Sequence, residues 1–183
     1  MPNSTQRYGT AAIILHWTVA AGILFAVAAG LYMNELDRGE TKDLILGIHK
    51  SAGLVILLLT LGRGLWRLAH PAPPLPPTMS ILQRRLAHAT HALLYAVAVA
   101  MPITGYIAVA ARGRETNFLG VLPVPILVPL DRALAHNAAT IHVCSQYALY
   151  ALVAGHAGAA LYHHFVTRDD ILRRMWPAFP KRS

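Results

Sequence analysis

Long apolar runs separated by short polar segments set the pattern of this chain. No Asp, Glu, Lys or Arg occurs within residues 8–34, 86–111 and 133–167, and Lys50 is the only one within residues 44–62. Each run is close to or above the roughly 20 apolar residues with which a helix crosses a bilayer. The pattern therefore predicts four membrane-spanning helices, at about residues 9–33, 44–65, 86–111 and 135–165.

The segments between these runs differ in character. Residues 34–43 are polar and solvated, whereas the proline-rich residues 70–77 cannot be helical and predict an extended linker. The connection after the third run contains an apolar stretch, residues 118–130, which is either an interfacial lid without chemistry or the lining of an access path. Pro102 lies inside the third run and predicts a kink there.

Composition places the chain in a membrane. It has 183 residues, 55% hydrophobic and 13% charged, whereas soluble domains carry about 25% charged residues. Four spans leave little of this length over, so we predict one domain, residues 1–183, with an all-α fold, an integral membrane four-helix bundle. The first run is longer than a signal-peptide core and is interrupted by His16 and Trp17, which favours a retained span.

The net charge of +8 comes from basic residues at the predicted helix ends, which favours a topological role over nucleic-acid binding. Four spans place both termini on one side of the membrane. Most Lys and Arg residues fall on that side, in the N-terminus, the second connection and the tail. The positive-inside rule therefore predicts that both termini are cytoplasmic.

Histidines are the candidate functional residues. His142 and His156 lie fourteen residues apart in the last run, which brings them within about 40° of the same helix face and separates them by roughly 21 Å. Ionisable side chains at such depth are functional candidates. The predicted topology gives His16 the depth of His156, nearer the cytoplasm, and gives His49 the depth of His142, nearer the outer face.

Two facing imidazoles across a helical bundle are the axial arrangement of a b-type haem, so two layers predict two haems. The alternative for each ring alone is a hydrogen-bonded structural role. A zinc site is weaker, because no Asp or Glu lies within a predicted span. The small residues beside the histidines either pack helices closely or leave room for a macrocycle. Cys144, the one cysteine, excludes an internal disulfide and a covalent Cys-x-x-Cys-His haem site.

Several motifs together resemble the bacterial cytochrome b561 family over nearly the whole chain. They are Ile14-Leu15-His16-Trp17, Gly47-Ile48-His49, Arg63 with Arg67, Pro102-Ile103-Thr104-Gly105, Arg112-Gly113, and the series from His142 through Gly155-His156 to Tyr162-His163-His164. The resemblance implies a multi-pass protein of the bacterial inner membrane with two haem b groups. It implies that His16 and His156 ligate the cytoplasmic-side iron and that His49 and His142 ligate the outer one.

The resemblance also bears on activity. Similar cytochromes exchange electrons with quinone, and some are described as superoxide oxidases that reduce ubiquinone. Others act as membrane subunits of hydrogenases or formate dehydrogenases. We therefore expect a superoxide:ubiquinone oxidoreductase, with a haem-bearing membrane anchor or electron relay for a separate dehydrogenase or hydrogenase as the alternative. A transporter without haem is a third reading. Expected partners are membrane lipid, quinone and superoxide, without nucleic acid.

Other polar residues receive roles from this reading. His163 follows His156 by seven residues and so shares its helix face; it would hydrogen-bond a quinone, or else extend to lipid headgroups. Arg63 and Arg67 would pair with haem propionates, or serve topology alone. His88 and His91 lie at the predicted cytoplasmic end of the third span and are left open between a structural role and contacts with quinone or propionates. His164 points away from the face of His156, and no specific role is expected for it.

Basic residues on the outer side also call for a reason, because the positive-inside rule disfavours them there. They would bind haem propionates or form a positive funnel that steers a small anion such as superoxide. They are Lys50, Arg112, Arg114 and Arg132.

Overall fold

Four long helices form most of the protein. The computed structural model describes residues 7–177, so residues 1–6 and 178–183 of the predicted domain lie outside the described residues. The helices are α1 (Thr10–Glu35), α2 (Glu40–Ala69), α3 (Ile81–Ala110) and α4 (Arg132–Tyr162), followed by a π-helical turn η1 (His163–Thr167) and a short helix α5 (Ile171–Met175). Each predicted span corresponds to one long helix, and α2 and α3 begin about a turn earlier than the apolar runs. The fourth predicted span was too long, because residues 163–165 lie in η1 and not in α4.

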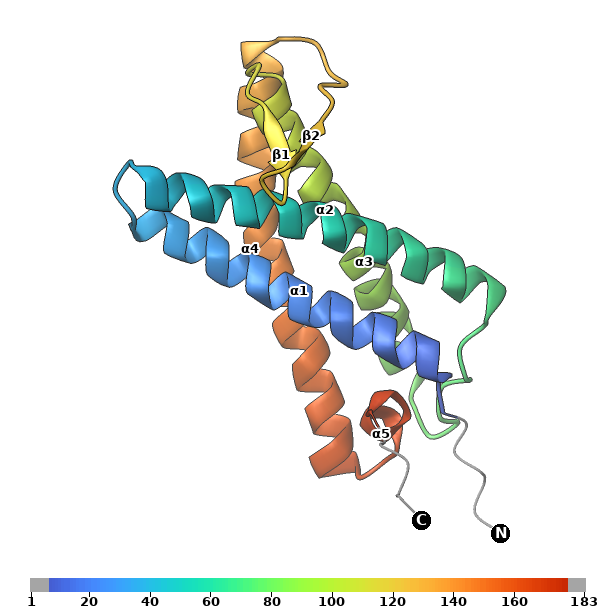
Figure 1. Ribbon diagram of the computed structural model, residues 1–183. Helices are drawn as coiled ribbons and strands as arrows, with labels where there is room; N and C mark the ends of the chain where they lie inside the picture. Colours follow the sequence, from blue (N-terminus) through green and yellow to red (C-terminus); the bar gives the residue numbers. More distant parts are fainter. Residues whose placement is uncertain (1–6, 178–183) are drawn as a thin grey trace, which may run out of the picture.

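The long helices are arranged as two pairs. α1 packs along α2 and α3 packs along α4, while α2 also contacts α3. Figure 1 shows the α1–α2 pair running obliquely across the α3–α4 pair. The chain therefore folds as two helical hairpins that cross each other.

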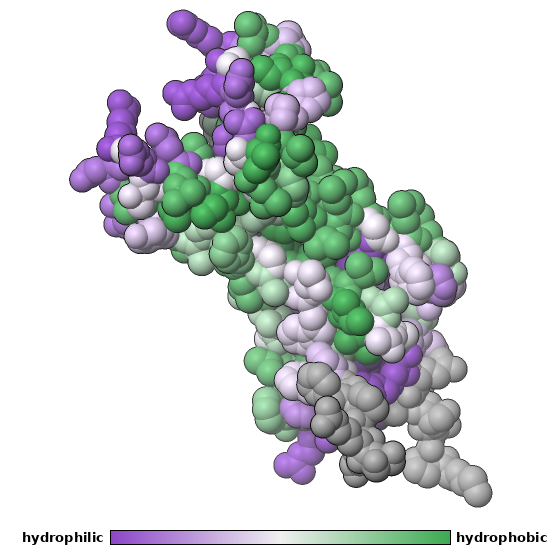
Figure 2. Space-filling view, viewed as in Figure 1, coloured by the Kyte–Doolittle hydropathy of each residue, from purple (hydrophilic) through white to green (hydrophobic). Residues whose placement is uncertain are grey.

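Three of these helices, α1, α2 and α3, are long and apolar enough to cross a membrane among the residues described. α4 is as long, but polar side chains such as His142, Gln146 and His156 interrupt its apolar residues. The fourth span therefore stays a prediction. Figure 2 shows hydrophobic residues in a band across the middle of the visible face and hydrophilic residues gathered toward the ends. Large apolar side chains such as Leu58 and Leu65 are 68% exposed, as expected of a surface that contacts lipid.

Local sequence signals fix the helix ends. The Ser80 hydroxyl accepts a hydrogen bond from the Gln83 backbone N–H, and the Gln83 side chain accepts one from the Ser80 N–H, which forms a capping box at the start of α3. The Asp131 carboxylate accepts the N–H groups of Ala133 and Leu134 at the start of α4. The proline-rich residues after α2 form no helix, as predicted.

One end of the molecule gathers three segments that are distant in sequence. The backbone N–H of Tyr8 donates to the Arg174 carbonyl at 3.2 Å, and the Arg174 guanidinium donates to the Pro74 carbonyl at 2.6 Å. The start of α1, the α2–α3 connection and α5 thus lie together, and the α1–α2 connection lies at the far end of its pair (Figure 1). Which end faces the cytoplasm stays a prediction.

A small β-hairpin departs from the predicted all-α fold. Strands β1 (Thr116–Phe118) and β2 (Leu122–Val124) pair antiparallel, and Leu119 and Gly120 adopt positive φ angles in the turn between them. The Leu119 N–H donates to the hydroxyl of buried Ser51 on α2 at 3.0 Å. The apolar stretch after α3 is therefore attached to α2, two residues beyond His49.

Candidate functional site

The structure brings the four predicted histidines together in two pairs. The ring centroids of His16 on α1 and His156 on α4 lie 6.1 Å apart, at an interplanar angle of 69°. The ring centroids of His49 on α2 and His142 on α4 also lie 6.1 Å apart, at 82°. These are the pairs that the predicted depths match. In each pair α4 supplies one ring and the α1–α2 pair supplies the other.

Hydrogen bonds to backbone carbonyls orient one of these pairs. Nδ1 of His49 lies 2.9 Å from the carbonyl oxygen of Ala26 on α1, and Nδ1 of His142 lies 2.8 Å from that of Met101 on α3. A carbonyl only accepts, so each Nδ1 carries the proton and each Nε2 keeps a free lone pair. This is the arrangement that metal-binding histidines commonly adopt.

A glycine one helical turn after each carbonyl makes room for the ring. A Cβ atom on Gly30 would lie 3.4 Å from Cε1 of His49, and a Cβ atom on Gly105 would lie 3.0 Å from Cε1 and Nδ1 of His142. Each helical hairpin thus holds one histidine ring in the same way. The ring hydrogen-bonds a backbone carbonyl and packs against a glycine four residues further along the same neighbouring helix. The small residues predicted to make room for a macrocycle lie beside each histidine on its own helix, and Gly30 was not among them.

A third ring joins the pair of His16 and His156. The His91 ring on α3 lies 5.2 Å from the His156 ring, centroid to centroid. α1 and α3 begin at the same end of the molecule, so the depth of His91 already indicated this position (Figure 1). Among residues 7–177, however, no three His, Cys, Asp or Glu side chains are arranged to hold one metal ion.

Cationic side chains lie beside this cluster. Arg63 is within electrostatic reach of His16, His91 and His156. Its guanidinium carbon lies 4.9 Å from the centre of the Tyr95 ring, a cation–π contact. Within residues 7–177 no carboxylate forms an ion pair with Arg63, so its charge is available to an anionic group.

Arg67 occupies the same end of α2. Its guanidinium carbon lies 5.7 Å from the centre of the Tyr8 ring. It too forms no ion pair with a carboxylate of the described chain. The structure thus brings Arg63 close to the paired histidines and places Arg67 against the N-terminal segment.

His163 is buried in the turn that follows α4. It is 8% exposed, and its Nδ1 lies 2.5 Å from Oδ2 of Asp169. The Thr167 hydroxyl lies 3.2 Å from the same carboxylate oxygen. The π-helical turn and the left-handed conformation of Arg168 reverse the chain and bring Asp169 back to the ring. This burial contradicts the alternative of a side chain extended to lipid headgroups. The contact with Asp169 was not predicted from the sequence.

The spacing of both pairs suits an iron ion between the rings. Metal–imidazole bonds are about 2 Å long, so two bonds and about 1 Å from each nitrogen to its ring centre put the centres of two rings on opposite sides of a metal roughly 6 Å apart. The observed 6.1 Å agrees with this value. A helical membrane protein with facing imidazoles at this spacing belongs to the class that holds haem between its helices.

Comparison with known proteins identifies the family. The family model described as prokaryotic cytochrome b561 matches residues 7–178, and the chain belongs to this family. It is 32% identical to cytochrome b561 homolog 2 of Escherichia coli K12 over 174 residues, which cover 94% of this chain and 93% of the relative. It is 30% identical to cytochrome b561 homolog 1 of the same strain, over 94% of this chain and 98% of the relative.

A third relative is named a probable superoxide oxidase, CybB, of Yersinia pestis. The two chains are 30% identical over 172 residues, which cover 94% of this chain and 97% of the relative. Family membership implies haem b binding and membrane electron transfer. The apolar helices agree with a membrane location.

Proposed function

We propose that this protein is a di-haem cytochrome b of the bacterial inner membrane that oxidises superoxide on the outer side and reduces ubiquinone. In the overall reaction two superoxide anions each lose one electron and become O₂. Ubiquinone gains both electrons and two protons and becomes ubiquinol. The observation that carries this proposal is the equal 6.1 Å spacing of two histidine pairs at different heights along α4.

His16 with His156, and His49 with His142, are the residues that would hold the two haems. When bound, the haems supply the one-electron chemistry that side chains lack. The chain's part is to hold and orient the rings, and the carbonyls of Ala26 and Met101 do this for His49 and His142. Arg63 and Arg67 would bind propionates near the other pair.

The proposal includes a topology: a four-helix membrane bundle, residues 1–183 as one domain, with both termini cytoplasmic. The shared end formed by Tyr8, Pro74 and Arg174 supports a common side for the N-terminal segment, the α2–α3 connection and the tail. Reporter fusions test it. Fusions after residue 75 should report the cytoplasm, and fusions in the α1–α2 connection should report the outer side. The reverse pattern would overturn the assignment of sides.

Electrostatics support superoxide as the donor. Lys50 directly follows His49 and lies within electrostatic reach of Arg114. Arg112 and Arg132, with Asp131 between them and one acidic charge against two basic ones, line a pocket where α3 ends and α4 begins. Positive charge beside the proposed outer pair would attract a small anion and raise its encounter rate. The printed name of the Yersinia pestis relative also supports this choice.

His163 is the residue that we assign to quinone. Asp169 accepts its Nδ1–H, which fixes the ring and leaves the Nε2 edge for a ligand. A proton at Nε2 would hydrogen-bond a quinone carbonyl and pass to it as the quinone is reduced. The turn that carries His163 follows α4 at the proposed cytoplasmic end, the same end as His156.

Purified protein tests the proposal directly. A pyridine haemochrome assay should give about two haems per chain, and the protein alone should consume superoxide when ubiquinone is added. Protein purified without colour from cells with ample protohaem would overturn the proposal. Haem-loaded protein that leaves superoxide untouched would overturn the choice of donor.

A second function has its own support. The segment after α3 exposes large apolar side chains, with Leu119 at 69% and both Val121 and Leu127 at 77%. Such a surface suits a partner protein, as in a haem-bearing anchor for a separate dehydrogenase or hydrogenase. In that case the isolated protein would carry haem but would reduce quinone only with its partner present.

A further inference from the structure

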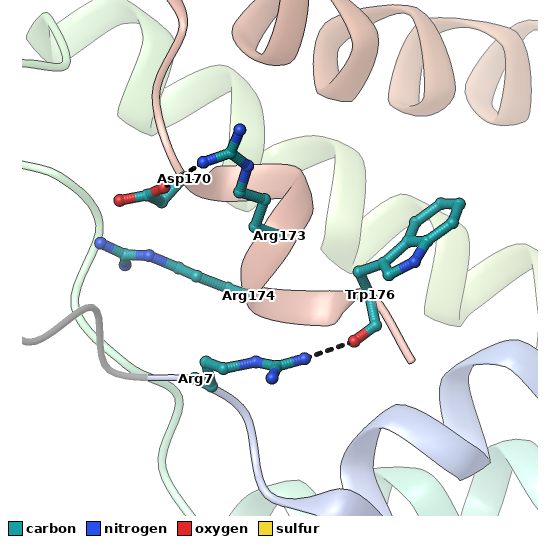
Figure 3. Close-up of a pocket in the computed structure, with 5 residues that line it drawn as sticks. All are labelled: Arg7, Asp170, Arg173, Arg174 and Trp176. Carbon is teal, nitrogen blue, oxygen red and sulfur yellow. Dashed lines mark hydrogen bonds and ion pairs between the residues drawn. The ribbon is translucent and has the colours of Figure 1, made fainter. Parts of the chain in front are cut away.

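An arginine-lined pocket lies where the N-terminal segment meets α5. It has a volume of about 310 Å³ and is lined by Arg7, Asp170, Arg173, Arg174 and Trp176. Figure 3 shows the side chains of Arg7 and Arg174 extending past each other in opposite directions from two different segments. The pocket therefore depends on the contact between the two ends of the described chain.

The pocket keeps a positive charge. Its one acidic residue, Asp170, lies 3.8 Å from the Arg173 guanidinium, and the Arg173 side chain is 72% exposed (Figure 3). An exposed pair at that distance neutralises little. Two arginines, Arg7 and Arg174, remain without an ion-pair partner among the described residues.

Hydrogen bonds to backbone carbonyls orient these two arginines but leave other guanidinium donors without an acceptor. Arg7 donates through Nη2 to the Trp176 carbonyl at 2.6 Å, and Arg174 donates through Nη1 to the Pro74 carbonyl at 2.6 Å. The Nε atom of Arg174 is buried and has no hydrogen-bond partner in residues 7–177. A guanidinium has five N–H donors, and one acceptor for each of these two arginines leaves donors and positive charge that suit an anionic group with several acceptor oxygens.

Aromatic residues beside the pocket indicate where such an anion comes from. Trp176 is 54% exposed, and its ring lies 6.1 Å from that of Trp17 on α1. The Trp17 indole donates to the Met175 carbonyl at 2.7 Å. Tryptophans gather at the level of lipid headgroups. Here Trp17 lies about two turns inside the start of the apolar helix α1, and Trp176 follows α5.

We propose that this pocket binds the phosphate of an anionic membrane phospholipid. Guanidinium groups match phosphate oxygens in geometry and charge, and free phosphate shares that chemistry. The lipid is favoured because the pocket lies beside exposed tryptophan at the end of an apolar helix. A bound headgroup would join the N-terminal segment to α5.

Calorimetric titration of the detergent-solubilised full-length protein tests this proposal. The probes are dihexanoyl phosphatidylglycerol, dihexanoyl phosphatidylcholine and inorganic phosphate. Phosphatidylglycerol should bind most tightly, because the choline cation repels the arginines and free phosphate lacks acyl chains. Arg7→Gln should weaken phosphatidylglycerol binding about fivefold, the effect of one basic residue at an anionic surface, and Arg174→Gln at least as much.

Arg85→Gln is the matched control, because Arg85 is exposed at the start of α3, at the same end but outside the pocket. Unchanged binding in both pocket variants, or an equal loss in Arg85→Gln, would overturn the proposal. Inorganic phosphate that binds as tightly as phosphatidylglycerol would overturn the lipid assignment. Circular dichroism checks that each variant keeps its helical structure. The readout is lipid binding and not enzymatic activity. If Arg174→Gln unfolds, Arg7→Gln still decides.

Discussion

The backbone carbonyl of Met101 accepts a hydrogen bond from Nδ1 of His142, at 2.8 Å. This bond joins α3 to α4 one residue before Pro102, and it leaves the opposite nitrogen of the His142 ring free. Because Gly105 lies one turn further along α3, the ring meets backbone instead of a side chain. The position of His142 is therefore set by α3 as much as by its own helix.

Gly105→Ala should displace the His142 ring from its position against α3. Alanine favours a helix by about 1 kcal/mol over glycine, but a Cβ at 3.0 Å from the ring must displace it, and overpacking costs about 1–3 kcal/mol. We expect a lower melting temperature and a changed haem absorption spectrum. The control is Gly62→Ala, where a Cβ meets nothing within 4 Å. If both variants keep the wild-type spectrum, the glycine is not needed for the ring.

Single-histidine variants should separate the two sites. His142→Ala should lower the haem-to-protein ratio from about two to about one, because a bis-imidazole iron loses one axial ligand. His156→Ala should lower the ratio in the same way at the other site. The absorption spectra of the haem that remains should differ between the two variants. Pyridine haemochrome assays measure both ratios. A full complement of haem in either variant would contradict its assignment as a ligand.

Asp169→Asn should impair the quinone reaction without affecting haem. The neutral amide oxygen accepts the Nδ1–H more weakly than a carboxylate does, so the His163 ring is held less firmly in its orientation. The rate with ubiquinone should fall by up to about 10²-fold, the contribution of one positioned proton donor, while haem content stays unchanged. Asp170→Asn, one residue along, is the control. An unchanged dependence of rate on quinone concentration in Asp169→Asn would remove the role proposed for His163.

Salt should slow the oxidation of superoxide. Screening at about 0.1 M ionic strength shortens electrostatic reach to about 10 Å, from about 30 Å at 0.01 M, so steering by Lys50 and Arg114 should weaken. Rates should fall several-fold over this range in the wild type, and less in Lys50→Gln. Arg85→Gln, at the opposite end of the molecule, should keep the wild-type salt dependence. A flat dependence in the wild type would argue against steering.

The sequence was sufficient for the helices and for the pairing of rings. Apolar runs located all four long helices, and helical periodicity placed His142 and His156 on one face of α4. Depth along each span then matched them with His49 and His16, which the structure brings to 6.1 Å. Periodicity predicts the depth and the helix face of each histidine, because it describes positions along and around a single helix.

The other contacts between helices could not be predicted from the sequence. Gly30 and Ala26 matter because α1 lies against His49, and the spacing of residues on α1 alone does not reveal this neighbour. Asp169 reaches His163 only through a π-helical turn and a left-handed residue. The hairpin of β1 and β2 was not predicted either, because residues 118–130 were interpreted only as an interfacial lid or the lining of an access path.

The crossing of the two helical hairpins has a consequence for biogenesis. Each pair of rings spans the boundary between hairpins, so on the proposed ligation the iron centres fasten the first half of the chain to the second. Each half could insert into the bilayer separately, and acquisition of cofactor would then complete assembly. Fragments 1–75 and 76–183, made together in one cell, should associate when protohaem is plentiful and separate when its synthesis is blocked.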